Sequence, residues 1–208
     1  MAQKEVVNLR KQLEHHISHH PEFKTSLTPV SSVPGVPDVA LEMIISGIRT
    51  HTGPMASVAG MFAYQVGEKI RHHFKVKELV IENGGDYYIF LKEDLLMTVY
   101  AGTSPLSEEI GVIVPSKETP CGICTSSGTV GPSLSFGKAD AVMVACYSPI
   151  LADGWATSLA NRVKSPSDIE SVLKYSEQFP EILSLVIICE DKTGIRGNFE
   201  VRFVDNLA

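Results

Sequence analysis

The stretch ELVIENGGDYYIFLKEDLLMTVY, residues 78–100, decides the fold class of this chain. Its apolar residues fall into short runs rich in β-branched and aromatic side chains, which are typical of strands. Turn-forming residues separate the runs, at Asn83-Gly84-Gly85 and at Lys92-Glu93-Asp94. The predicted strands are Glu78–Glu82, Tyr87–Leu91 and Leu95–Tyr100, and Glu109–Val114 follows them. Short consecutive strands joined by tight turns predict an antiparallel meander rather than parallel βαβ units.

Helices and further strands are predicted on both sides of this region. Apolar residues recur at spacings of three and four over residues 55–74, after Gly53-Pro54, which predicts an amphipathic helix. Residues 152–163 and 165–178 predict two more helices, the second with Ser165 as N-cap. The remaining predicted strands are Val39–Ile45, Ala139–Cys146, Leu183–Cys189 and Phe199–Val204, with a turn over Asp191–Asn198 before the last. The fold class predicted is therefore α+β, with antiparallel strands covered by helices.

Composition limits the classes of function. The chain has 208 residues, 44% of them hydrophobic, and a formal net charge of −6, which is typical of a folded globular protein. A net negative charge argues against strong binding to nucleic acid or to an anionic membrane. No apolar run is long enough to span a bilayer, and the first residues lack a signal-peptide pattern, so we expect a cytoplasmic protein. Residues 1–37 predict a polar helix and a Pro-rich connector, and residues 38–208 a single α+β domain.

The predicted N-terminal helix carries a histidine cluster. His15 and His19 are spaced i, i+4, as are His16 and His20, and this spacing suits a metal site on one helix face. An exposed polar helix end has the same pattern and is the favoured interpretation.

Two glycine-containing segments are candidates for ligand binding. In Thr52–Gly60, a turn leads into a helix start made almost entirely of small residues, where free N–H groups could bind an anion or a close-packed backbone could lie. In Glu82–Asp86, two glycines permit positive φ while Glu82, Asn83 and Asp86 supply oxygens. An ordinary β-hairpin would have the same Asn-Gly signature.

Two later segments add hydroxyl, thiol and carboxylate groups. Gly122–Gly131 is rich in Gly, Ser and Thr and predicts a loop with many donors, suited to a phosphate. Cys121 and Cys124 form a C-x-x-C that could be a reactive dithiol, carry a persulfide, or be two buried structural thiols. Asp153 and Thr157 are spaced i, i+4 at a helix start, so their oxygens share a face suited to Mg²⁺, unless Asp153 only satisfies helix N–H groups.

These segments together resemble the ApbE family of bacterial flavin transferases, and most closely its UPF0280 group. The resemblance rests on GPMASVAG, ENGGD, CTSSGTVG with SLSFGKAD, and ADGWATSLAN, in this order between about Arg49 and Asn161. It implies a T-fold: antiparallel sheets covered by helices, in two related halves with the ligand site between them. T-fold sites often lie at or near subunit contacts, so the resemblance also allows a homo-oligomer.

The resemblance implies a role for each motif. ApbE enzymes hold Mg²⁺ beside a pyrophosphate with an Asp and a Thr, here Asp153 and Thr157, and with a carbonyl from the small-residue helix start, here within Ala56–Ala59. The implied ligand is a small phosphate-containing anion, FAD, FMN or nucleotide-like. Its predicted binding residues are Ala56, Ser57, Asn83, Gly84, Gly85, Asp86, Thr125, Ser126, Ser127 and Gly128.

The chain departs from the flavin transferases in two ways. Their helix start usually carries a Lys, which Pro54–Gly60 lacks, and their His-x-x-x-Pro segment is replaced here by residues 132–140, with no His after His73. The leading hypothesis is therefore a metal-dependent phosphoryl- or nucleotidyl-transfer enzyme or its relic. A non-catalytic binding module and a sulfur-handling protein that uses Cys121 and Cys124 stay open as alternatives.

Overall fold

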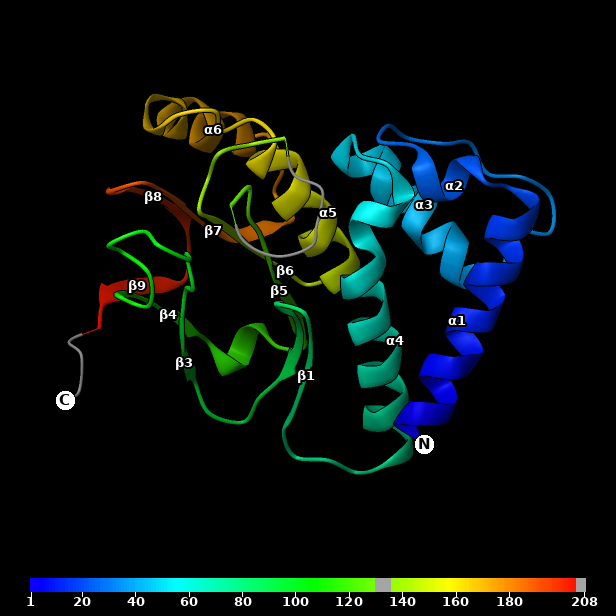
Figure 1. Ribbon diagram of the computed structural model, residues 1–208. Helices are drawn as coiled ribbons and strands as arrows, with labels where there is room; N and C mark the ends of the chain where they lie inside the picture. Colours follow the sequence, from blue (N-terminus) through cyan, green and yellow to red (C-terminus); the bar gives the residue numbers. More distant parts are fainter. Residues whose placement is uncertain (130–135, 205–208) are drawn as a thin grey trace.

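A computed structural model describes residues 1–129 and 136–204. Helices, a large sheet and a small sheet form successive layers (Figure 1). The helices are α1 (Ala2–His19), α2 (Glu22–Thr25), α3 (Asp38–Thr50), α4 (Val58–His73), α5 (Pro149–Ala160) and α6 (Ile169–Ser176), with the short 3₁₀ turns η1 (Pro54–Ser57), η2 (Ser116–Glu118) and η3 (Pro166–Asp168). The strands are β1 (Leu79–Asn83), β2 (Asp86–Phe90), β3 (Leu95–Thr98), β4 (Ile110–Val114), β5 (Cys121–Ser126), β6 (Ala141–Cys146), β7 (Ile182–Cys189), β8 (Lys192–Gly197) and β9 (Glu200–Phe203). The α+β prediction is confirmed.

Both sheets are antiparallel, but they are not one meander. The larger has the order β1-β2-β5-β6-β7-β8 and the smaller the order β3-β4-β9. The predicted β1–β2 hairpin is present, yet β2 has β5 rather than β3 as its second neighbour. The meander prediction is wrong at this point because β3 and β4 leave the large sheet and pack on its face. The two related halves remain a prediction.

The centre of the large sheet is buried on both faces. In β6, Val142 and Val144 join the helix-side cluster that contains Trp155 of α5. Met143, which lies between them, joins a second cluster that contains Val112 of the small sheet. Side chains alternate between the faces of a strand, so one apolar run contributes to two cores.

Three predicted elements are corrected. Val39–Ile45 is not a strand but part of α3, whose buried residues Val39, Met43 and Gly47 follow helical spacing. The predicted loop at Gly122 is instead the central strand β5, and Pro149 of α5 lies against the bare backbone of Gly122. Asp191–Asn198 is largely the strand β8, paired with β7. Of the predicted loop over residues 122–131, Val130 and Gly131 lie outside the described residues.

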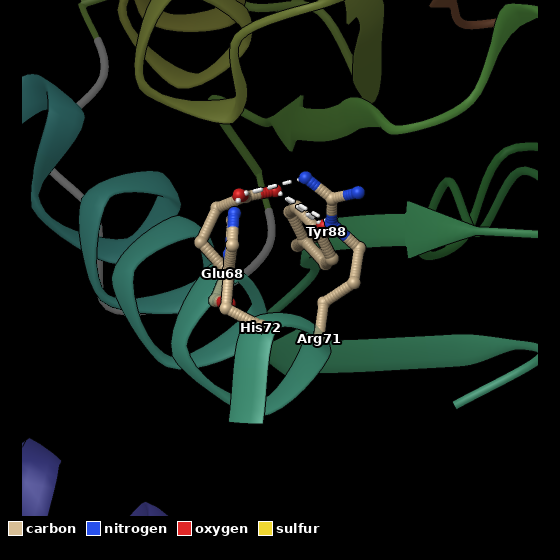
Figure 2. Close-up of polar contacts among 4 residues, drawn as sticks. All are labelled: Glu68, Arg71, His72 and Tyr88. Carbon is tan, nitrogen blue, oxygen red and sulfur yellow. Dashed lines mark hydrogen bonds and ion pairs between the residues drawn. The ribbon is translucent and has the colours of Figure 1, made fainter. Parts of the chain in front are cut away.

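Helix α4 is held on β2 by a polar cluster (Figure 2). The buried Tyr88 donates its hydroxyl hydrogen to Glu68 Oε1 at 2.6 Å, and Arg71 binds both oxygens of Glu68. His72 Nδ1 lies 3.3 Å from Glu68 Oε2. Burial raises the pKa of Glu68, but hydrogen bonds from Arg71 and Tyr88 outweigh it and leave the pKa lowered. The carboxylate is therefore charged and fixes the position of α4 along the sheet.

Helix α1 packs on α3 and α4 rather than standing apart. Leu9 and Leu13 of α1 share a buried cluster with Met43 of α3 and Met61 of α4. The boundary at residue 37 stays a prediction. None of the helices in the described part of the chain is both long and apolar enough to cross a membrane.

Candidate functional site

Asp153 joins the start of α4 to α5. Its Oδ2 accepts a hydrogen bond from the backbone N–H of Gly60 at 2.9 Å. A Cβ on Gly60 would overlap the carbonyl oxygen of Pro149 and come within 2.9 Å of Asp153 Cβ. The small residues at the start of α4 therefore allow the two helices to touch, and one N–H group that was predicted to face an anion is occupied by Asp153.

The β1–β2 hairpin brings two polar side chains to the same place. Gly84 and Gly85 form its turn with φ of 68° and 98°, which only glycine adopts readily. Asn83 and Asp86 pair across the base of this turn. Asn83 donates from Nδ2 to the carbonyl oxygen of Ala59 at 3.1 Å, next to Gly60. The segment is therefore a β-hairpin, and its contribution to a ligand site stays a prediction.

Asp86 is buried with an unused oxygen. The residue is 7% exposed, and its Oδ1 has no hydrogen-bond partner among the described residues. Burial raises the pKa of the Asp86 carboxyl to about 7, against the opposing effect of the Cys124 side chain and the Thr125 backbone N–H. A buried carboxylate oxygen without a partner is energetically costly, so this position favours a proton or a cation.

Asp86 and Asp153 act on each other electrostatically. Burial raises the pKa of Asp153 well above its usual range, and the Asp86 carboxylate raises it further. The backbone N–H groups of Gly60 and Ala59 oppose that rise. Neighbouring carboxylates in a low-dielectric site resist being charged together unless positive charge is supplied.

The donor set fits a magnesium ion that is shared with a ligand. No group of three or more His, Cys, Asp and Glu side chains suited to a metal occurs among residues 1–129 and 136–204, and this includes the histidines of α1. Asp86 and Asp153 offer two carboxylates, and the partly buried Thr157 lies one turn further along α5. Mg²⁺ commonly takes one or two protein carboxylates and completes its shell with phosphate and water. The unpartnered Asp86 oxygen is the feature that fits this chemistry.

Several predicted residues have other roles in the structure. Ser57 is fully buried and its hydroxyl bonds that of Ser46 at 2.7 Å, so it packs α3 against α5 around Gly154. Ala56 lies in the turn η1. Thr125 and Ser126 end β5, and Gly128 donates its N–H to Ala139, which ties that end to the approach to β6. The contribution of Ser126, Ser127 and Gly128 to a ligand site stays a prediction.

Cys121 and Cys124 lie on opposite faces of β5. Cys121 is buried in the core under the small sheet, and Cys124 in the core under α5. Burial raises the pKa of Cys121 to about 12 and that of Cys124 well above its usual value, with Asp86 adding to the second effect. Reactive thiols need exposed, electropositive surroundings, so this geometry favours the structural interpretation of the pair.

The sequence indicated Asp86 and Asp153 as candidate site residues, but it did not indicate that their carboxyl groups interact. One signal was present: Asp86 and Tyr88 share a strand face, so a carboxylate stands at an inward position beside a buried aromatic residue. The partner of Asp86 lies about 67 residues away and depends on how α5 crosses the sheet, which no local pattern specifies.

This fold, with carboxylates beside a small-residue helix start, defines an ApbE-like α+β protein. The family model described as "AbpE bacteria" matches residues 1–176. A UPF0280 protein of Methanocaldococcus jannaschii is 35% identical over 201 residues, covering 94% of this chain and 81% of that protein. One of Methanosphaerula palustris is 40% identical over 164 residues, covering 79% and 68%. The chain belongs to the UPF0280 family.

The solved structure of an ApbE protein agrees with this fold. The ApbE protein of Thermotoga maritima superposes with a TM-score of 0.51 at 14% identity. The match covers 73% of this chain and 51% of that one, so this chain spans about half the length of that protein. The flavin transferase ApbE of Vibrio cholerae gives a TM-score of 0.48 at 14% identity, covering 97% of this chain and 73% of that one.

Proposed function

We propose that this protein binds a phosphate-containing, flavin- or nucleotide-like ligand together with Mg²⁺ where α4, α5 and the β1–β2 hairpin meet. The observation that carries the proposal is the buried, unpartnered Oδ1 of Asp86 in a site where Asp153 supplies a second carboxylate. Neither carboxylate has a Lys or Arg as an ion-pair partner among the described residues. A divalent cation would neutralise both and attract a phosphate.

The residues of the proposed site have separate roles in this proposal. Asp153 would hold the cation through the carboxylate oxygen that Gly60 does not engage, and Asp86 through its free Oδ1. Asn83 keeps the Ala59 carbonyl fixed at the edge of the site. The ion, when bound, would stabilise charge that develops on a phosphate oxygen. Phosphoryl or nucleotidyl transfer is the reaction class that needs little more from a protein than this positioning.

A non-catalytic binding module is the second candidate. The groups that the structure assembles around Asp86 and Asp153 are carboxyl, amide, thiol and backbone groups. Among the described residues, none of these groups belongs to a Lys or His, the residue types whose absence from the motifs separates this chain from the flavin transferases. FMN transfer itself therefore has the weakest support.

Calorimetric titration of the metal-stripped protein with Mg²⁺, with and without FAD, FMN or ADP, tests the proposal. We expect Mg²⁺ binding that each effective ligand strengthens. Asp153→Asn should weaken it by about tenfold or more, because the main carboxylate ligand is lost. Glu93→Gln is the matched control, since it removes an exposed carboxylate from the turn that follows β2.

The outcomes separate the candidates. No heat and no thermal stabilisation with any pair of Mg²⁺ and ligand would contradict the proposal. Binding with turnover of FAD or a nucleotide, detected by chromatography, supports a transfer enzyme, whereas binding without turnover supports the module.

A further inference from the structure

A groove lies between α1, α4 and β1, on the side of α4 away from α5. Its volume is about 700 Å³, within the range of small-molecule sites. Its walls are mainly apolar, with Ile17 on α1, Val58 and Phe62 on α4, and Ile81 on β1. We propose that this groove binds a single small apolar anion, meaning a ring system or chain that carries one carboxylate, sulfonate or phosphate group.

The groove is held open by contacts at the two ends of α1. Near its start, Glu5 forms an ion pair with Lys69 at the end of α4. Near its end, His16 packs edge-on against the buried Phe23 of α2, with ring centroids 5.0 Å apart. In Figure 1, α1 starts beside the C-terminal end of α4 and diverges from it toward α2. These contacts fix α1 against α4 at one end and against α2 at the other, so the groove is formed by the packing of the chain itself.

The charged residues at the rim of the groove determine which charge a bound molecule should carry and how it should be oriented. Arg10 is already paired with Glu14 at 2.7 Å. Lys24, which also lines the groove, forms no ion pair with any of the described residues. On the opposite wall, the Glu82 carboxylate accepts the N–H of Gly85. An anionic group would therefore lie near Lys24, with the apolar body between α1 and α4.

Of the residues discussed above for the site around Asp86 and Asp153, Asn83 also lines the groove. Asn83 lines the groove and also bonds the Ala59 carbonyl beside Gly60. Occupation of the groove needs neither Mg²⁺ nor Asp153, so the inference does not depend on the proposed function. A small molecule fits the groove volume and the Lys24 charge at its rim better than a second copy of the chain, whose net charge is −6.

Fluorescence titration with 8-anilinonaphthalene-1-sulfonate, an apolar anion, tests the inference on the folded 208-residue chain. We expect saturable binding of one equivalent. Val58→Trp should weaken it by about tenfold or more by filling the groove. Ile48→Trp, at a 54% exposed position on α3, is the matched control and should bind as the wild type does. If Val58→Trp does not fold by circular dichroism, Ile81→Trp fills the groove from the strand side.

A second experiment tests the role of the Lys24 charge. Lys24→Gln should weaken binding of the anionic dye several-fold and leave binding of neutral N-phenyl-1-naphthylamine unchanged. Asp153→Asn should bind the dye normally while binding Mg²⁺ more weakly, so failure of one proposal is distinguishable from failure of the other. The inference is overturned if native protein shows no saturable binding, if Val58→Trp and Ile48→Trp both match the wild type, or if sedimentation shows a dimer whose dissociation is required for dye binding.

Discussion

Asp86 is the residue at which the chemistry of this protein departs most from ordinary packing. Burial raises the pKa of its carboxyl from 3.8 to about 7. Between these values the folded protein keeps a proton that the unfolded chain has lost. Folding stability contributed by this group is therefore fully present below about pH 4 and is lost as pH rises toward 7.

We expect Asp86→Asn to remove that pH dependence from the metal-free protein. The free energy of unfolding, measured by urea titration in EDTA between about pH 4 and about pH 8, should fall less with rising pH than in the wild type. Asp153 titrates in the same direction, so some slope should persist in the variant. Glu93→Gln, at an exposed position in the turn after β2, should keep the wild-type profile. Parallel profiles for Asp86→Asn and the wild type would show that Asp86 is ionised at low pH despite its burial.

At the scale of elements, α4 is the component on which both proposed sites depend. In its first turns, Gly60 lies against α5. Val58 and Phe62, on another side of the helix, line the groove. Further along, Gly67 lies directly against the ring of Tyr88, and Glu68 bonds the hydroxyl of the same residue. The position of α4 on β2 therefore sets the geometry of the site and of the groove together.

Tyr88→Phe should lower the free energy of unfolding by roughly 1.5–3 kcal/mol, because it removes a hydrogen bond to a charged carboxylate. Urea unfolding followed by circular dichroism measures this loss. Tyr64→Phe is the control on α4, since no hydrogen bond from the Tyr64 hydroxyl occurs within the described part of the chain. Equal stabilities for the two variants would mean that Arg71 alone anchors Glu68.

At the scale of the whole molecule, three buried clusters stabilise the part of the chain that the structure describes. Two of them lie on opposite faces of the large sheet, and the third joins α1, α3 and α4. The strands β6 and β7 contribute to the first two clusters at once, which links the helical layer to the small sheet. The third cluster decides whether residues 1–37 fold with the rest of the chain.

Leu9→Ala tests whether α1 belongs to the same cooperative unit. Leu9 is 5% exposed in the third cluster, so its truncation should cost about 2–4 kcal/mol in a single unfolding transition. Val7→Ala, at a 47% exposed position of the same helix, should change stability by less than about 0.5 kcal/mol. A second, earlier transition in Leu9→Ala would instead support a boundary near residue 37.

The sequence by itself determined the strands and helices with strong periodicity, the β1–β2 turn and the family motifs, because side-chain spacing and glycine geometry act over a few residues. It failed at α3, where a short apolar run alternates as a strand does, and at β5, whose small residues suit a loop but here accommodate Pro149. Only the tertiary structure decided that Asp86 and Asp153 lie close enough to interact electrostatically, that Cys121 and Cys124 face different cores, and that α1 leaves a groove beside α4. These features depend on how distant segments cross. No local sequence pattern predicts which residues are buried at such a crossing or which charges come together there.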